Sequence, residues 1–330
     1  MIAPPLPVPV MAAKAYGLSI RACRQVRGAW RLETDRGVFA LKRALPEEKA
    51  AFLRAAETHL LDGGFTRFPR QVPTRTGEPE CVLATGERFV LRAWLPGIHP
   101  KLDLDHPRDI RRLTKAVAEA HLASAGFRPE SGPSPEPNPA QFGAHLAEIE
   151  RLFDRADSGS RFTRLYRQAI PRNLEEGARA CQMLREADYE GLLLETRARG
   201  GLCHGDLAPA NSLIHGPEAF LLDMDRACLA PFPFDLEKLV RRALSLLGWP
   251  SRLAMDLLDG YQRHRQLTRR EMRVLTALLH WPQAFWRLGH QYFAERLDRP
   301  EGFFLSRLWH VENAAQARRS FLAFCRENLW

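Results

Sequence analysis

The chain has 330 residues and a formal net charge of +9, and 45% of its residues are hydrophobic while 26% are charged. This composition is typical of a globular protein with a full-sized core, and it excludes a mostly disordered chain. Domains usually contain roughly 100–200 residues, so we expect two packed lobes. The excess of basic residues favours a polyanionic ligand such as a nucleotide, or an acidic partner surface.

Cysteine usage and hydropathy narrow the class of protein further. The six cysteines are scattered without a CxxC pair, which favours reduced thiols in a cytosolic compartment over a zinc site or a disulfide framework. No run of about 18 apolar residues exists, so we expect no membrane insertion. Residues 1–14 begin with an apolar, proline-rich stretch that lacks a basic start. We interpret them as a flexible leader rather than a secretory signal.

Residues 15–95 are expected to form a small β-rich lobe of five strands and one helix. The helix is predicted to begin at Pro46, with acidic residues in its first turn, and to end at Gly63 and Gly64. Alternating polar and apolar residues predict the strands, which cover residues 19–26, 29–35, 38–44, 80–86 and 88–95.

The pattern changes at a short hinge, Leu95-Pro96-Gly97, and residues 96–330 are predicted to be mainly helical. The stretch 127–143 is rich in Pro and Ser and is predicted to be a surface loop. The fold class is therefore α+β, with a small β-rich lobe followed by a larger helical lobe. Hydrophobic periodicity predicts the helices of the larger lobe, which cover residues 107–125, 140–155, 161–198, 235–247, 251–264, 268–295 and 308–328.

The strongest chemical signal lies in residues 202–225. The run His204-Gly205-Asp206-Leu207, followed by Asn211, fits the kinase catalytic-loop pattern H-x-D-L-x-x-x-N, with glycine where protein kinases carry arginine. An apolar strand then ends at Asp223, in the place of the kinase D-F-G element. A lone His-Gly-Asp is as often a simple turn. The complete set in this order favours phosphoryl transfer.

The chemistry of phosphoryl transfer explains why these residue types are needed. The acceptor hydroxyl must lie in line with the γ-phosphate, and Mg²⁺ must neutralise charge on the phosphate oxygens. The Asp206 carboxylate can accept the hydroxyl proton. Asn211 and Asp223 supply the oxygen ligands that Mg²⁺ prefers. Asp225 lies two residues further on and is a further candidate ligand, because alternate residues of a strand share one face.

Lys42 is the second signal, because it lies on the third predicted strand in the run Phe39-Ala40-Leu41-Lys42. This run is close to the V-A-I-K strand that places a lysine on the α- and β-phosphates of a nucleotide. A lone lysine in a strand more often faces solvent, but the catalytic-loop pattern favours the functional interpretation. A buried lysine needs a carboxylate partner. We prefer Glu57 for this role, and Glu47 and Glu48 are alternatives.

Taken together, these motifs and the segments WRLETDRGVFALKRA, HLLDGGFTRFP and FLLDMDRA resemble a known family. They are similar to the spore coat protein S family, within the aminoglycoside phosphotransferase and choline kinase branch of the protein-kinase-like superfamily. The resemblance covers about residues 15–325. It implies a two-lobed protein-kinase-like fold that binds ATP and Mg²⁺ in the cleft, with a nucleotide-binding lobe at residues 15–95 and an acceptor site in the helical lobe.

The resemblance also implies a role for each matching residue. Asp206 would be the catalytic base, with Asn211 and Asp223 as magnesium ligands. Lys42 would anchor the phosphates. The backbone around Ala93, Trp94 and Leu95 would meet the adenine.

Besides Gly205, the chain departs from the protein-kinase pattern in two further places. The loop that would cover the nucleotide holds Gly28 as its single glycine, where a protein kinase has three. Glycine-rich turns cradle phosphates through their backbone amides, so weak phosphate binding stays open. Only about a dozen residues separate Asp223 from the predicted helix near Asp235, which favours a small-molecule acceptor over a peptide. Asp235 is expected to brace the catalytic loop.

Other candidate residues carry weaker signals. Cys203 ends an apolar run and is expected to be a core thiol. His280 and His290 lie on an aromatic-rich helix and are expected to pack in it rather than to bind metal. No nucleic-acid-binding motif is present.

Two functions of different kinds remain. In the first, the protein is a spore-coat-associated, Mg-ATP-dependent phosphotransferase that acts on a hydroxyl of a small molecule. In the second, it is a catalytically weak or inactive coat component that uses the kinase fold as a scaffold for other spore coat proteins. In both cases the resemblance implies synthesis in the mother-cell cytoplasm and deposition on the spore coat. The sequence leaves the acceptor, the choice of ATP or GTP and the oligomeric state open.

Overall fold

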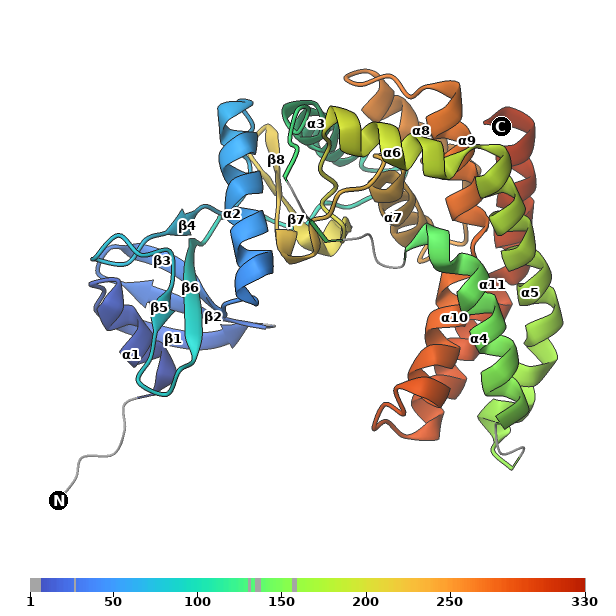
Figure 1. Ribbon diagram of the computed structural model, residues 1–330, viewed down its shortest axis with the longest axis horizontal. Helices are drawn as coiled ribbons and strands as arrows, with labels where there is room; N and C mark the ends of the chain where they lie inside the picture. The colour runs from blue at the N-terminus through green and yellow to red at the C-terminus, as the bar shows by residue number, and fades with distance from the viewer. Residues whose placement is uncertain (1–6, 27, 130–131, 134–137, 156–158, 330) are drawn as a thin grey trace.

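The computed structural model describes residues 7–26, 28–129, 132–133, 138–155 and 159–329. A sheet lobe and a larger helical lobe lie side by side along the long axis (Figure 1). This arrangement confirms the predicted two-lobed α+β fold. Among the described helices, none has the length and apolarity needed to cross a membrane.

The sheet lobe is built on an antiparallel sheet in the order β1-β2-β3-β6-β4, with β5 also paired to β6. All five predicted strands are present, although the strand expected over 80–86 is reduced to Cys81–Val82. The prediction missed β4, because two residues between Arg70 and Pro73 carry no periodic signal. The bounds are β1 Ile20–Val26, β2 Ala29–Thr34, β3 Gly37–Arg43, β4 Gln71–Val72, β5 Cys81–Val82 and β6 Arg88–Ala93.

The prediction of a flexible leader over residues 1–14 is wrong for residues 8–14, because Val8–Ala15 form helix α1. Residues 1–6 lie outside the described residues. Proline is tolerated in the first turn of a helix, where no intrahelical partner is lost, and Pro9 occupies that turn. Ala12 and Ala13 are buried in one apolar cluster with Leu32 and Leu41 of the sheet. The sheet lobe therefore contains two helices, and α1 belongs to its core.

Helix α2 (Glu47–Asp62) follows the third strand and begins after Pro46, as predicted. Its buried residues Phe52, Leu53 and Leu60 belong to the same apolar cluster as Leu113 of the helical lobe. Figure 1 shows α2 standing between the sheet and the hairpin of the helical lobe. The helix is thus joined to the helical lobe by apolar packing, and to the sheet by chain connectivity and by ion pairs such as Glu57 with Arg92.

The helical lobe follows the predicted outline with three differences. The helix expected over 161–198 is broken at Asp188, which has φ of 52°. The helix expected over 268–295 is broken near Pro282, and the last helix begins at Glu301 rather than at residue 308. The bounds are α3 Pro107–Ala123, α4 Phe142–Arg155, α5 Arg161–Glu186, α6 Tyr189–Arg199, α7 Pro233–Leu244, α8 Ser251–Gln262, α9 Arg269–His280, α10 Gln283–Gly289, a π-helical turn His290–Ala294 and α11 Glu301–Asn328.

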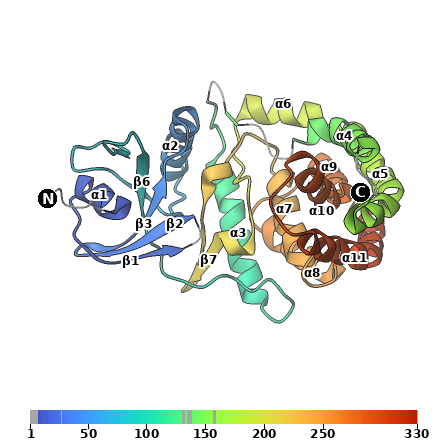
Figure 2. The same cartoon turned by 90° about the horizontal axis from the view of Figure 1, so that it is seen from below.

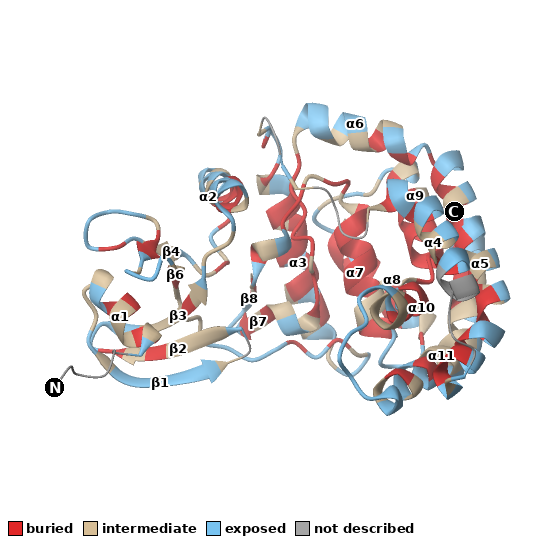
Figure 3. Cartoon of the chain, turned by 60° about the horizontal axis from the view of Figure 1, so that its bottom comes forward, coloured by how far each residue is buried: buried red, intermediate tan, exposed pale blue. Residues whose placement is uncertain are grey.

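A short hairpin, β7 (Ser212–His215) and β8 (Glu218–Leu221), lies on the side of the helical lobe that faces the sheet (Figure 2). Figure 3 shows that α3 and α7 are the most buried helices, while α5 and α6 present exposed outer faces. The hairpin and α7 flank the predicted catalytic loop. The loop is therefore held between the core of the helical lobe and the cleft. Of the predicted loop 127–143, residues 130–131 and 134–137 lie outside the described residues.

Candidate active site

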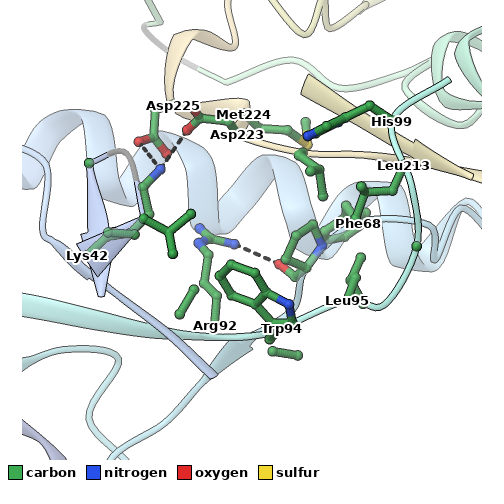
Figure 4. Close-up of a pocket in the computed structure, with 18 of the residues that line it drawn as sticks. Lys42, Phe68, Arg92, Trp94, Leu95, His99, Leu213, Asp223, Met224 and Asp225 are labelled. Atoms are coloured by element: carbon green, nitrogen blue, oxygen red, sulfur yellow. Dashed lines mark hydrogen bonds and ion pairs between the residues drawn. The ribbon is translucent and has the colours of Figure 1, made fainter. Parts of the chain in front are cut away.

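A cavity of about 590 Å³ lies between the two lobes. Its walls come from the sheet, from the hinge after β6 and from the residues that follow β8. Figure 4 shows the Lys42 side chain reaching from its strand toward Asp223 and Asp225, with Trp94 further along the wall. The structure thus brings residues from distant parts of the sequence to one cavity, as the kinase-like motifs predict.

Lys42 forms ion pairs with two carboxylates from the helical lobe. Its Nζ lies 2.6 Å from Oδ1 of Asp223 and 2.7 Å from Oδ2 of Asp225. Burial alone would lower the pKa of the Lys42 ammonium, but Asp225 and Asp223 outweigh it and raise this pKa. Burial would likewise raise the pKa of Asp223, yet the bond from Lys42 lowers it. Both groups are therefore charged at neutral pH.

The predicted pairing of Lys42 with Glu57 is not observed. Glu57 lies on α2 and its Oε1 is 2.7 Å from Nη1 of Arg92, which is paired across the sheet with Ala40. Burial raises the pKa of Glu57, and Arg92 opposes this change. The alternatives fail as well, since Glu47 pairs with Arg54 of its own helix and Glu48 is exposed to solvent. Glu57 nevertheless lines the cavity.

The predicted base, Asp206, is held by two partners. Its Oδ2 accepts a hydrogen bond of 3.0 Å from the Asn211 amide, and its Oδ1 lies 2.5 Å from Nη2 of Arg242. Arg242 also donates to the backbone carbonyls of Asp206 and Leu207. The sequence analysis missed Arg242, which lies on α7, 36 residues after the carboxylate. The arginine fixes the position of the carboxylate at the rim of the loop.

The turn before Asp206 requires glycine. Gly205 has φ of +76°, and a Cβ added there would lie 1.8 Å from the carbonyl oxygen of Arg226. The buried Asp235 carboxylate accepts the backbone N–H groups of His204 at 2.6 Å and of Gly205 at 2.9 Å. These bonds confirm that Asp235 braces the loop. Glycine therefore replaces the kinase arginine because the loop packs directly on the chain after Asp223.

The His204 imidazole joins the loop to the strand that leads to Asp223. Its Nδ1 accepts the backbone N–H of Asp206 at 3.3 Å, which leaves Nε2 to donate to the Leu222 carbonyl at 2.7 Å. Asp223 itself has φ of 61°, a left-handed conformation that is costly for a residue with a Cβ. The fold thus holds the backbone of Asp223 in a strained conformation, next to the hydrogen bonds that fix the position of Asp206.

The donor atoms here fit a hard divalent cation. The Asp223 and Asp225 carboxylates already converge on a single cation, the Lys42 ammonium. Asp223 follows β8, and the backbone N–H of its neighbour Leu222 donates to the Asn211 carbonyl at 2.8 Å. Because the Asn211 amide nitrogen donates to Asp206, its oxygen is the polar atom left for a metal. Carboxylate and amide oxygens are the ligands that Mg²⁺ prefers.

The residues predicted to meet the nucleotide also line this cavity, whereas Asp206 and Asn211 are not among its described lining residues. Gly28, Ala93, Trp94 and Leu95 all line it. The Trp94 ring lies under the Arg31 guanidinium, 5.4 Å from its centre. Their contact with the nucleotide stays a prediction. Of the nucleotide-covering loop, Arg27 lies outside the described residues.

A second group of ligand-type residues, His121, Cys203 and Asp235, is fully buried in the helical lobe. Each is already engaged, since Cys203 donates to the Ala230 carbonyl and His121 bonds to both Tyr261 and Asp235. Burial raises the pKa of the Cys203 thiol well above its usual range, which disfavours the thiolate that a metal would need. This group is part of the core. His280 and Cys203 are buried, as expected for packing residues.

Comparison with known proteins agrees with this geometry. A model of a family described as the phosphotransferase enzyme family matches residues 24–275. Spore coat protein S of Bacillus subtilis is 22% identical over 287 residues, which cover 84% of this chain and 81% of the relative.

Solved structures show the same fold. An aminoglycoside phosphotransferase from Alicyclobacillus acidocaldarius superposes with a TM-score of 0.83 at 23% identity, covering 100% of this chain and 98% of the other. A spectinomycin phosphotransferase, solved with ADP and spectinomycin, gives a TM-score of 0.65 at 12% identity, covering 94% and 95%. These likenesses confirm the kinase-like fold.

Proposed function

Because the chain belongs to the phosphotransferase enzyme family, we propose that it is a kinase that transfers the γ-phosphoryl group of MgATP to a hydroxyl of a small molecule. One observation carries the proposal. Lys42 of the sheet lobe and two aspartates of the helical lobe converge across the cleft within 2.7 Å, beside a loop that holds Asp206 in place.

Each residue of the site would have its own role in the proposed reaction. The Lys42 ammonium would hold the phosphates, and Asp223, Asp225 and the Asn211 oxygen would hold Mg²⁺. When bound, Mg²⁺ neutralises charge on the phosphate oxygens. Asp206 would orient the acceptor hydroxyl and accept its proton. The hydroxyl oxygen forms a bond to the γ-phosphorus as the bond from that phosphorus to the β–γ bridging oxygen breaks, and ADP leaves.

Two observations support ATP as the phosphoryl donor. The cavity is lined by Ala93, Trp94 and Leu95, which offer backbone and apolar surface to a flat base. The kinases of similar fold include the spectinomycin phosphotransferase solved with ADP. The single glycine of the covering loop predicts modest affinity for the phosphates.

The likeness to spore coat protein S supports a second part of the proposal. We place the protein in the mother-cell cytoplasm and then on the spore coat, with other coat proteins as partners. The same likeness favours the alternative function, a coat scaffold whose nucleotide binding is vestigial. The sequence retains all four motif residues, Lys42, Asp206, Asn211 and Asp223, which supports the enzyme over the scaffold.

A thermal-shift measurement with MgATP separates the two functions. A ligand that binds the native state at a hundredfold excess over its Kd stabilises it by about 2.7 kcal/mol. We expect this shift in the wild type and in Asp206→Asn, but not in Asp223→Ala, which loses a metal ligand. Asp259→Asn changes an exposed carboxylate of α8 and serves as the control.

Measuring the phosphorylation of an acceptor completes the test of the proposed kinase activity. A metabolite screen for MgATP consumption should find an acceptor for the wild type, and Asp206→Asn should abolish its phosphorylation. An absence of any shift at millimolar MgATP would favour the scaffold. Wild-type phosphorylation by Asp206→Asn would show that another group is the base.

A further inference from the structure

The Lys42 ammonium and a divalent cation need the same carboxylate oxygens. Nζ of Lys42 lies 2.6 Å from Oδ1 of Asp223 and 2.7 Å from Oδ2 of Asp225. Proteins hold Mg²⁺ by carboxylate oxygens at about 2.0–2.1 Å and Ca²⁺ at about 2.3–2.6 Å. A divalent cation bound between these two oxygens would therefore lie where the ammonium lies, and one point cannot hold both.

A turn in the chain brings the two aspartates together. Asp223 has φ of 61°, and residues Met224–Arg226 form one turn of 3-10 helix directly after it. Figure 4 shows both carboxylates meeting the end of the Lys42 side chain. Two carboxylates held this closely repel each other unless a cation lies between them. The pair therefore needs a cation, and a lysine or a metal ion can supply the charge.

The ammonium excludes a metal from the rest of the pair as well. Each aspartate has a second oxygen, but a divalent cation bound there would still be a close neighbour of the ammonium, and like charges repel. Among the described residues that line the cavity, the one further carboxylate is Glu57, which pairs with Arg92. Within the described cavity, Lys42 thus has the two aspartates as its available anionic partners.

The phosphates of a nucleotide would give the ammonium another partner. Lysine binds phosphate as a point charge, and Lys42 lines the cavity proposed for the nucleotide. Phosphates that draw the ammonium away would free both aspartates for a metal, and the metal would in turn bind the same phosphates. By thermodynamic reciprocity, each of the two ligands then raises the affinity of the other by the same factor.

We infer that Lys42 is the resident cation of the Asp223–Asp225 pair, and that a divalent cation replaces it only together with a nucleotide. The inference rests on the proposed function in taking a nucleotide as the ligand, and it adds how the site is filled. A metal ion alone binds weakly, because it must displace an ion-paired ammonium. Lys42 is therefore both the phosphate anchor and the group that couples metal binding to nucleotide binding.

Titration with Mn²⁺ measures the effect of the ammonium without any turnover. Electron paramagnetic resonance reports free Mn²⁺, and the titration is made without nucleotide. Competition from two partly exposed ion pairs weakens a ligand roughly tenfold, so Lys42→Met should bind Mn²⁺ more tightly than the wild type by this factor. Lys14→Met removes an exposed lysine of α1 that does not line the cavity, and it should bind Mn²⁺ as the wild type does.

Two further variants locate the effect. Lys42→Arg keeps the positive charge and should bind Mn²⁺ as weakly as the wild type. Lys42→Met combined with Asp223→Ala removes one of the two carboxylates and should lose the gain, because a divalent cation then keeps a single acidic ligand of the pair. The unfolding temperature of each variant without metal shows whether it is folded. A gain that persists in the double variant would place the metal elsewhere and overturn the inference.

Adding ADP tests the coupling in the wild type itself. Water-proton relaxation distinguishes Mn²⁺ bound to protein from MnADP in solution. We expect ADP, but not adenosine, to give a protein-bound Mn²⁺ complex at Mn²⁺ concentrations that give none without it. Equal Mn²⁺ binding with and without ADP, or by the wild type and Lys42→Met, would overturn the inference and leave the kinase proposal intact. A gain in Lys42→Met without any ADP complex would keep Lys42 as the resident cation but refute nucleotide binding, and with it the proposed kinase.

Discussion

Replacing Gly205 by alanine tests whether the tight turn before Asp206 sets both stability and activity. A residue with a Cβ at φ of +76° is strained by roughly 1–2 kcal/mol. The new Cβ would also lie 1.8 Å from the Arg226 carbonyl oxygen, whereas carbon–oxygen contacts are about 3.3 Å or longer. The chain must therefore move by roughly 1.5 Å, and overpacking of this kind costs about 1–3 kcal/mol.

We therefore expect Gly205→Ala to lower the free energy of unfolding by about 2–5 kcal/mol. Gly216→Ala is the matched control, because Gly216 has φ of +57° and a Cβ there meets nothing within 4 Å. It should lose only the backbone strain, roughly 1–2 kcal/mol. Equilibrium unfolding in urea measures both changes.

The same pair of variants tests activity. Misplacing a catalytic group by about 1 Å can lower a rate on the order of a hundredfold, so Gly205→Ala should lose phosphotransfer while Gly216→Ala keeps it. Equal destabilisation of the two variants would refute the steric argument. Full activity in Gly205→Ala would show that Asp206 does not depend on this turn.

Three further substitutions test the roles of Asp235, which braces the catalytic loop, of the Lys42 ammonium and of the buried His280. Asp235→Ala leaves two buried backbone N–H groups unpaired and should cost about 3 kcal/mol in urea unfolding, against less than about 0.5 kcal/mol for the exposed Asp259→Ala. Lys42→Met should abolish the thermal shift by MgATP, whereas the exposed Lys14→Met should keep it; an unchanged shift in Lys42→Met would contradict the phosphate role. Burial lowers the pKa of His280 to about 4, so the stability from its neutral form is complete above pH 6.5 and lost as the pH falls toward 4, by about 3 kcal/mol. His280→Gln should remove this loss of about 3 kcal/mol in the free energy of unfolding between pH 6.5 and pH 4, measured by urea unfolding at each pH. The same pH dependence in the variant and in the wild type would exclude His280 as its source.

The catalytic loop could be predicted from sequence because its chemistry is local. Asp206 and Asn211 lie within one loop, and the carboxylate of Asp223 ends the next strand, so their spacing in the chain carries the signal. Lys42 could be predicted because β3 has a recognisable strand pattern ending beside it. For these residues, a short stretch of sequence determines the geometry.

Other parts of the site depend on packing that no short stretch encodes. Arg242 reaches Asp206 only because α7 crosses beneath the loop. Glu57 faces Arg92 rather than Lys42, because the rotation of α2 is set by its apolar contacts with the helical lobe. Helix α1 was missed because its buried residues are small alanines, and their burial depends on the sheet below them.

The two faces of α2 make contacts of opposite character. Toward the helical lobe it packs Phe52 and Leu60 into a large apolar core. Toward the sheet, Glu57 pairs with Arg92 and Arg54 pairs with Glu80.

The Glu57–Arg92 pair is largely buried, with side-chain exposures of 10% and 15%, and salt screens buried pairs much less than exposed ones. Helix α2 is therefore held on both sides, by apolar packing on one and by buried ion pairs on the other. Any widening of the cleft would have to strain one of these two sets of contacts, so the helix would couple the position of the sheet to that of the helical lobe.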